Sequence, residues 1–289
     1  VARSLAVARA IRVSNITYQL NFRIPDNLAQ PVTGRLRLSF HLTNTKTDLP
    51  LDFAGKDVQH LGHINGKSFK AEWQSEHILL PHQALRRGLN VVDLVFTAAD
   101  KSLNRHADYL YSLFVPANAR TVFPCFDQPD LKALFKCTLQ APDGWVSRCS
   151  DSTHVLPTYL FSFVAGKFQT KTVVRDGRHM TALYRETDPA KVAQLDKCFD
   201  EAALALRWLE RYTARSCPFS DYGFVVLPGY QFGGMEHPGA IQFTDREIFL
   251  GPQPTPDEEM TRLQLIAHET AHLWFGDMVT MRWFDDVWT

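Results

Sequence analysis

Two histidines and a glutamate stand at a spacing that suits metal chemistry. Residues 265–276 are LIAHETAHLWFG, so that His268 and His272 are four positions apart and Glu269 follows the first of them. Residues four apart lie one turn above each other on a helix, and both imidazoles then reach one Zn²⁺ at ~2.0–2.1 Å. Glu269 then projects beside the metal, where it takes a proton from a metal-bound water. The H-E-x-x-H pattern therefore predicts a zinc site with Glu269 as the catalytic residue.

The pattern requires a helix, and the preceding residues supply a start signal for one. Thr255 is a capping residue, Pro256 suits the first helical turn, and Asp257 and Glu258 face the positive end of the helix dipole. The residues flanking the motif carry no charge. A chance pairing of two helical histidines is the alternative, and the cap and the uncharged flanks favour the zinc site. The other nine histidines are expected on the surface or in packing positions.

Upstream of this helix, the hydrophobic pattern changes its period once. Apolar and polar residues alternate in the first part, which predicts half-buried strands in an antiparallel, sheet-on-sheet domain. After about Arg185 the apolar residues recur at helical spacing, and Asp188 with Pro189 marks the start of one long amphipathic helix. The predicted strands are 16–24, 36–42, 91–96, 133–139, 158–164 and 167–174, followed after the helix by 224–227 and 240–243.

Length and composition indicate how these elements are divided into domains. With 289 residues, 45% of them hydrophobic and 21% charged, the chain is expected to be an ordinary globular protein of two domains. We place a β-rich domain at residues 1–170 and a second domain at residues 171–289, which gives an α+β, multidomain class. Lys and Arg together number 31, as do Asp and Glu, so the formal net charge is zero. The protein as a whole therefore has no excess positive charge that would favour binding of nucleic acid. No apolar run reaches the ~20 residues of a membrane-spanning helix, and no membrane partner is expected.

Two linked motifs resemble the aminopeptidase N family of zinc metallopeptidases, the gluzincins. Residues 274–281 (WFGDMVTM) and 283–288 (WFDDVW) are similar to that family's run between its H-E-x-x-H and its third zinc ligand. Residues 233–239 (GGMEHPG) are similar to its Gly-x-Met-Glu-Asn motif, which lies before the zinc helix. Residues 123–133 and 159–166 resemble stretches of its N-terminal β domain. The resemblance assigns substrate binding to Gly233, Gly234, Met235 and Glu236.

Four positions depart from the family's pattern. His237 stands where Asn is common, and Val115 stands near a position where Glu or Gln helps to hold the substrate amine. The valine cannot accept a hydrogen bond from an amine, so the preference for the first residue of the substrate is expected to differ. Asp277 and Phe284 are variants of positions that are usually Asn and Trp.

The resemblance implies a saddle-like β domain followed by the first part of a thermolysin-like catalytic domain. The family's third ligand is a Glu about eighteen residues beyond the second His, which falls beyond Thr289. We therefore expect an incomplete N-terminal fragment, inactive as it stands, whose partner is the remaining C-terminal part of its own catalytic domain. Its missing helices are expected to leave apolar surface exposed.

The function implied for the full-length protein is hydrolysis of the N-terminal residue of peptides, with zinc as the cofactor and peptides as substrates. An endopeptidase or an epoxide hydrolase of the same zincin class stays open, as does a β-rich binding module without catalysis for the fragment itself. A cytoplasmic and an exported enzyme fit the sequence equally well.

Overall fold

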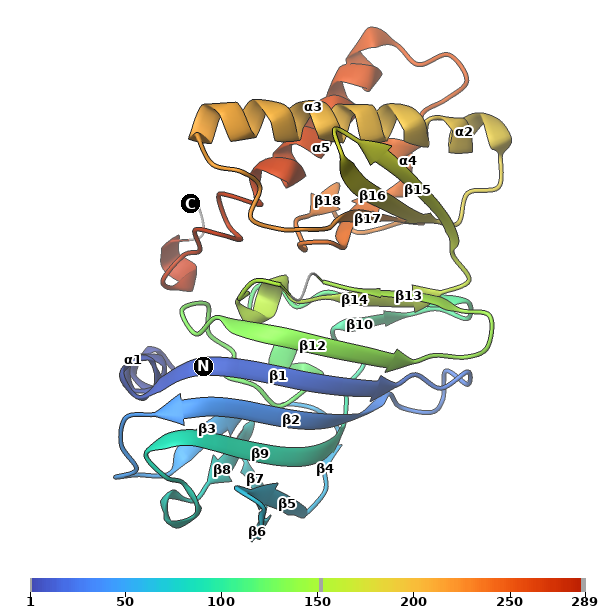
Figure 1. Ribbon diagram of the computed structural model, residues 1–289. Coiled ribbons are helices and arrows are strands. Elements are labelled where there is room, and N and C mark those ends of the chain that lie inside the picture. The colour runs from blue at the N-terminus through green and yellow to red at the C-terminus, as the bar shows by residue number, and fades with distance from the viewer. Residues whose placement is uncertain (1, 151–152, 287–289) are drawn as a thin grey trace. The chain divides into compact units, whose positions relative to one another are not determined.

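The computed structural model describes residues 2–150 and 153–286 (Figure 1). The chain divides into two compact units. The N-terminal unit comprises residues 2–147, 155–166 and 281–286 of the described chain, and the second unit comprises 148–150, 153–154 and 167–280. The boundary predicted from the sequence lies after residue 170, whereas the main division in the structure follows Gly166 and two short segments cross it.

The N-terminal unit is built almost entirely of strands. Its long strands alternate buried and exposed side chains, as the sequence pattern predicts. The elements are α1 (Arg3–Arg12), β1 (Val13–Arg23), β2 (Thr33–Leu42), β3 (Leu49–Asp52), β4 (Asp57–Val58), β5 (Leu61–Ile64), β6 (Lys67–Lys70), β7 (Glu72–Gln74), β8 (His77–Leu80), η1 (His82–Ala84), β9 (Gly88–Thr97), β10 (Leu103–Arg105), β11 (Tyr109–Ser112), η2 (Ala119–Thr121), β12 (Ala133–Gln140), β13 (Val146–Cys149), η3 (Thr158–Leu160), β14 (Phe163–Gly166) and η4 (Phe284–Asp286).

These strands form three sheets, and Figure 1 shows β12, β1, β2 and β9 side by side in the largest. That sheet has the order β12-β1-β2-β9-β5-β6, with β4 also pairing with β9. Its pairs are antiparallel except β1 with β12, which run parallel. The smaller sheets have the orders β10-β11-β14-β13 and β3-β8-β7. The helices and antiparallel sheets of the chain confirm the predicted α+β class.

Aromatic side chains fill the core of this unit. The rings of Phe22 and Phe163 stack with centroids 4.7 Å apart, and those of Phe135 and Phe161 with centroids 4.5 Å apart. Tyr18 is fully buried, and its hydroxyl accepts a hydrogen bond of 2.9 Å from the backbone N–H of Phe126. The inward positions of the alternating strands therefore carry large rings that join the sheets.

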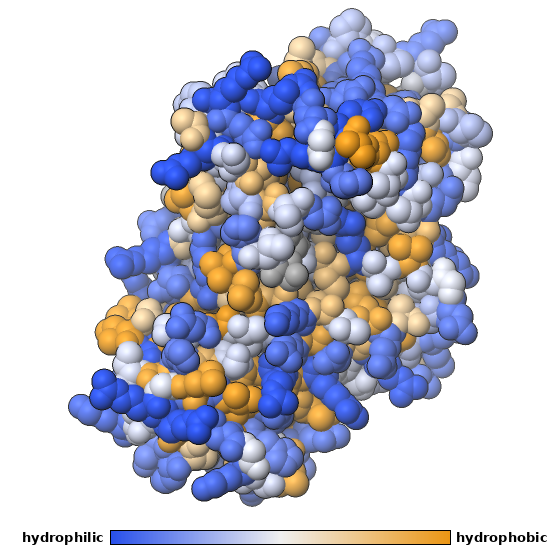
Figure 2. Space-filling view, in the orientation of Figure 1, coloured by the Kyte–Doolittle hydropathy of each residue, from blue (hydrophilic) through white to orange (hydrophobic). Residues whose placement is uncertain are grey.

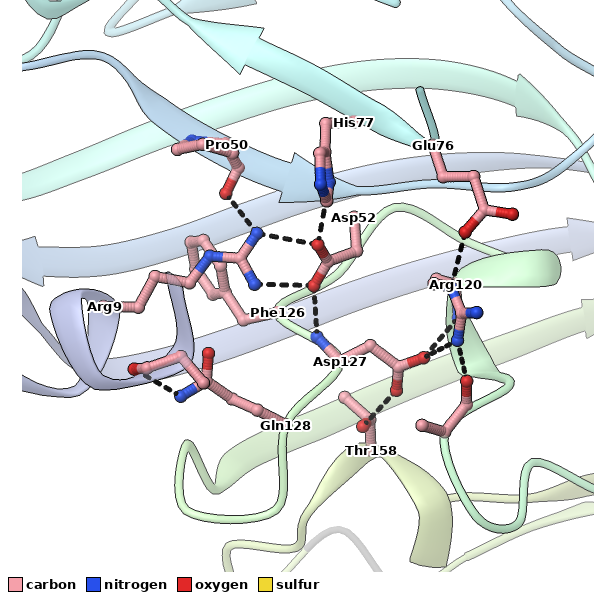
Figure 3. Close-up of polar contacts among 12 residues, drawn as sticks. Arg9, Pro50, Asp52, Glu76, His77, Arg120, Phe126, Asp127, Gln128 and Thr158 are labelled. Carbon is pink, nitrogen blue, oxygen red and sulfur yellow. Dashed lines mark hydrogen bonds and ion pairs between the residues drawn. The ribbon is translucent and has the colours of Figure 1, made fainter. Parts of the chain in front are cut away.

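A buried polar network crosses the same unit (Figure 3). Arg9 of α1 donates two hydrogen bonds of 2.7 Å to the carboxylate of Asp52, and Asp52 also accepts from the backbone N–H of Asp127 at 2.9 Å. Asp127 accepts from the hydroxyl of Thr158 at 2.7 Å and pairs with Arg120 at 3.4 Å. The network ties α1 and β3 to the loop that contains Asp127. One of the two N-terminal stretches that carry the family resemblance therefore has a structural role.

The second unit is a mixed sheet with helices packed on it. Its elements are β15 (Gln169–Arg175), β16 (Arg178–Tyr184), α2 (Pro189–Ala193), α3 (Leu195–Thr213), β17 (Tyr222–Leu227), β18 (Gly234–Met235), β19 (Ile241–Thr244), α4 (Asp245–Ile248) and α5 (Pro256–Ala271). The strand order is β15-β16-β17-β19-β18, with β16, β17 and β19 parallel. In Figure 1, α5 passes behind α3 at an angle; α3 contacts β15 of this sheet, and α5 contacts β18. Parallel strands and helices together are expected when crossovers connect the strands.

Two sequence-based elements differ from the structure. The strand predicted at 158–164 is a 3-10 turn at Thr158–Leu160 followed by β14, because Pro157 precedes the turn and the Thr158 hydroxyl is committed to Asp127. The single helix predicted after Asp188 is divided into α2 and α3 at Gln194. The side chain of Gln194 bonds both backbone groups of Leu250, which anchors the chain at the division.

The surface is mixed in hydropathy. On the face drawn in Figure 2, hydrophilic side chains surround separate hydrophobic patches. Among the described residues, no helix is both long enough and apolar enough to cross a bilayer.

Candidate metal centre

The candidate metal centre is built on α5, and local sequence explains where this helix begins. The Thr255 hydroxyl accepts from the backbone N–H of Glu258, while the Glu258 carboxylate accepts from the backbone N–H of Thr255. This capping box satisfies two amides that a helix start leaves unpaired, and Pro256 fits the first turn. The helix ends at Ala271, so His272 is its C-cap and keeps helical backbone angles.

The structure brings His268 and His272 together. Their Nε2 atoms are 3.1 Å apart, and the two rings are nearly perpendicular. Nδ1 of His272 lies 2.8 Å from the carbonyl oxygen of Phe275. A proton on Nδ1 satisfies that carbonyl and leaves the Nε2 lone pair for a metal, which is the arrangement of a metal-binding histidine. Two imidazole ligands on a tetrahedral Zn²⁺ have nitrogens about 3.3 Å apart, close to the observed separation.

The environment also favours the uncharged form of His268. Partial burial lowers the pKa of His268, the neighbouring His272 lowers it further, and the carboxylate of Glu236 opposes both. A metal ligand must be a neutral imidazole, so this pKa shift helps to keep the nitrogen available near neutral pH.

Two carboxylates complete the cluster. Oxygens of Glu236 and Glu269 and a ring nitrogen of His272 all lie within 4.8 Å of one another. Glu269 is only 4% exposed, and burial, followed by the charge of Glu236, raises the pKa of Glu269 to about 8. Two carboxylates close together in a buried site repel each other, and a cation between them would relieve that repulsion. The two imidazole nitrogens fit a divalent metal, and the carboxylates of Glu236 and Glu269 lie beside His272.

The segment that carries Glu236 lies against α5. Met235 is buried at the end of β18, and Glu236 follows it half-buried. A Cβ built at Gly234 would lie 2.6 Å from Cδ of Glu269, and one built at Gly233 would lie 3.3 Å from Leu265. These glycines therefore allow the strand backbone to approach the helix closely.

The remaining residues singled out in the sequence have simple placements. The side chain of His237 is fully buried and lies in the second unit, so it is not a surface residue. Val115 is half-buried in the N-terminal unit.

Sequence reasoning missed one polar contact next to the motif. The hydroxyl of Tyr222 lies 2.9 Å from the hydroxyl of Thr270, and both side chains are buried. The only signal in the sequence is the threonine inside H-E-T-A-H, at a helix position that faces the interior.

Comparisons with known proteins point to one family. The model of the peptidase family M1 domain matches residues 198–289, which include the two histidines and both glutamates, and the model of the peptidase M1 N-terminal domain matches residues 99–150. Aminopeptidase N of Streptomyces lividans is 30% identical over 242 residues, which cover 75% of this chain and 28% of that protein. Aminopeptidase N of Lactobacillus helveticus is 31% identical over 188 residues, which cover 59% of the chain and 22% of the relative.

A third relative is matched over more of the chain. Probable aminopeptidase 1 of Sulfurisphaera tokodaii is 29% identical over 264 residues, covering 82% of the chain and 33% of that protein. The chain therefore spans between about a fifth and a third of the length of these curated relatives.

Proposed function

Because the chain belongs to peptidase family M1, the family of aminopeptidase N, we propose that it is part of a zinc-dependent aminopeptidase that hydrolyses the N-terminal residue of peptides. The observation that carries the proposal is the convergence of His268 and His272 with the carboxylates of Glu236 and Glu269. Packing alone does not explain a pair of imidazoles in contact, one of them beside two carboxylates, because such polar groups are costly to bury without a binding partner.

Membership of this metallopeptidase family implies a metal cofactor, and we propose that the metal is zinc. His268 and His272 would hold it through Nε2, the nitrogens that lie 3.1 Å apart. Bound zinc polarises a carbonyl and lowers the pKa of a water molecule. We infer a third ligand in the remaining part of the catalytic domain, as the family resemblance implies.

Glu269 is assigned to proton transfer. Its carboxylate is buried beside the histidines, and this burial raises the pKa of Glu269 because little water solvates the charged form. A carboxylate with few competing solvent contacts accepts a proton from a nearby water more readily than an exposed one. It then delivers that proton to the leaving amine.

Glu236 is assigned to recognition of the substrate's amino terminus. An exopeptidase must recognise a cationic amine one residue from the bond that it cuts, and a carboxylate near the metal is a charge-assisted partner for it. Glu236 lies close to His272 and directly follows β18, which is the last strand in its sheet. The free edge of β18, with Gly233 and Gly234, is suited to pair with a substrate backbone, while Met235 fixes the strand through its buried side chain.

We also propose that the remaining part of the catalytic domain packs on α3 and α5. Between these helices is an apolar groove of about 340 Å³ lined by Leu204, Ala205, Trp208, Leu209, Leu263, Ala267 and Ala271. Trp208 is 58% exposed and stacks on the exposed ring of Tyr212. Exposed apolar surface of this kind marks an interface, and relatives about three times as long as this chain contain further polypeptide that could cover it.

The proposal is tested by comparing free and N-acetylated peptides as substrates of the full-length protein. We expect the free peptides to lose their first residue and the acetylated ones to resist. Glu236→Ala should cost about 2–5 kcal/mol in transition-state binding, measured from kcat/KM, because it leaves the amine without its charged partner. Glu247→Ala, on α4 and outside the cluster, is the matched control and should retain activity. Internal cleavage of acetylated peptides would replace the aminopeptidase with an endopeptidase.

A further inference from the structure

One buried hydrogen bond connects the sheet of the second unit to the H-E-T-A-H motif. Tyr222 begins β17, and its hydroxyl lies 2.9 Å from Oγ1 of Thr270 on α5. Oγ1 of Thr270 also donates to the carbonyl oxygen of Ile266 at 2.6 Å. A threonine hydroxyl has a single proton. Because Ile266 takes that proton, the hydroxyl of Tyr222 is the donor to Thr270.

The bond joins the two parts of the proposed site. β17 pairs with β19, and β19 pairs with β18, the strand that leads into Glu236. Thr270 directly follows Glu269 on the helix that carries the histidines. Tyr222 therefore links the sheet that leads into Glu236 to α5, which carries His268 and Glu269 and ends at the C-cap His272.

The spacing between this sheet and this helix is tight where the chemistry is proposed. The side chain of Glu269 lies against the backbone of Gly234 with no room for a Cβ between them. A small rotation of α5 would therefore move Glu269 either into β18 or away from Glu236. The second-unit sheet consequently limits any movement of the Glu269 side chain toward β18.

The surroundings of Tyr222 are consistent with a fixed donor. Burial raises the pKa of Tyr222, the hydrogen bond to Thr270 opposes the rise, and the charges of Cys217 and Glu269 add to it. The hydroxyl of Tyr222 thus stays protonated, and the charge of Glu269 contributes to the raised pKa of Tyr222.

We propose that Tyr222 is a positioning residue, which fixes the rotation of α5 against the sheet through its bond to Thr270 and so holds Glu269 and the histidines opposite Glu236. This inference rests on the proposed function, because it assigns Tyr222 to the same site. The competing explanation is that the bond only stabilises the fold.

The test uses variants of the full-length protein. The control is Tyr18→Phe, which removes a buried tyrosine hydroxyl from the N-terminal unit. Tyr222→Phe and Thr270→Val should each lower kcat/KM by about 10- to 100-fold, which is the range for residues that orient a metal site without contacting the metal. The double variant should be no worse than Thr270→Val alone, since both substitutions remove the same bond between Tyr222 and Thr270. Thr270→Ser keeps an oxygen that accepts from Tyr222 and donates to Ile266, so it should stay within about 2-fold of wild type. Tyr18→Phe removes a comparable buried bond in the N-terminal unit and should leave kcat/KM unchanged.

A second measurement separates positioning from stability. The zinc dissociation constant, obtained by competition with a chelator, should rise by about 10-fold in Tyr222→Phe and Thr270→Val and stay at the wild-type value in Tyr18→Phe and Thr270→Ser. If Tyr222→Phe matches Tyr18→Phe in both kcat/KM and zinc affinity, the positioning role is wrong while the proposed function stands. If the wild-type protein neither binds zinc nor cleaves peptides, the proposed function fails, and the role of Tyr222 fails with it.

Discussion

Replacing Arg9 with methionine should destabilise the N-terminal unit strongly. The side chain of Arg9 is 1% exposed and that of Asp52 is fully buried, and two hydrogen bonds of 2.7 Å join them. Arg9 also donates to the carbonyl oxygen of Pro50 at 2.8 Å. Methionine fills most of the volume but removes the guanidinium that pairs with the Asp52 carboxylate. Breaking a buried ion pair in this way costs about 3–5 kcal/mol.

The pKa of Asp52 depends on the same interaction. Burial alone would raise this pKa, but hydrogen bonds from His77 and Arg9 and the charge of Arg9 outweigh burial and lower it from 3.8 to about 2. The ionised form is thus favoured in the folded protein by about 2 kcal/mol. This stabilisation is fully present above the unfolded pKa of about 3.9 and is lost as the pH falls through about 2. Without Arg9, the hydrogen bonds from His77 and Asp127 remain, but the pKa of Asp52 should rise because the neighbouring positive charge is lost.

The assay is urea denaturation of wild type and Arg9→Met between pH 7 and pH 3. The difference in unfolding free energy should be largest near neutral pH and should shrink on acidification, because protonation of Asp52 removes the unpaired charge. Arg3→Met is the control on the same helix, since Arg3 is 70% exposed and lies 3.7 Å from Asp285. Its cost should stay below about 1 kcal/mol.

A double substitution makes the test specific to the ion pair. Asp52→Asn introduced into Arg9→Met removes the orphaned charge while keeping an oxygen that accepts from Asp127, so it should recover part of the lost stability. The reasoning is refuted if Arg9→Met costs no more than Arg3→Met, or if the deficit grows as the pH falls.

Three further predictions concern the second unit. In the full-length protein, Glu269→Gln should abolish turnover and keep zinc, as measured by peptide hydrolysis and metal analysis, and loss of the metal would contradict the assigned role in proton transfer. His272→Ala should weaken zinc binding by the 289-residue chain at least 10-fold in chelator competition. His179 is exposed, so His179→Ala is the control and should leave the zinc affinity unchanged. The zinc affinity of the wild type should fall on acidification, because protons compete with the metal for the imidazoles. We expect the 289-residue chain to self-associate through its exposed apolar groove, and Trp208→Lys should reduce this association in analytical ultracentrifugation because it places a charge there. Association that is absent in the wild type, or unchanged in the variant, would show that the groove is not a contact surface.

The local elements were accessible from the sequence because their signals lie within a few residues of each other. The start of α5 is specified by Thr255, Pro256 and Glu258, and the helix brings His268 and His272 together by its period alone. The alternation in 16–24 and 36–42 likewise predicted strands that the structure has as β1 and β2. In each case the physical cause is a backbone period that repeats along the chain.

Only the tertiary structure decided the contacts between distant segments. The parallel pairing of β1 with β12, the bond between Arg9 and Asp52 across 43 positions, and the approach of Glu236 to Glu269 have no local signal. A turn at Thr158–Leu160 stands where a strand was expected, because the hydroxyl of Thr158 donates a hydrogen bond to Asp127, 31 positions away. Such pairs form only when packing brings the segments together, since their gain must offset the entropy of closing long loops. Sequence therefore determined which residues carry the proposed chemistry, and the fold determined that the Tyr222 hydroxyl meets Thr270 behind them.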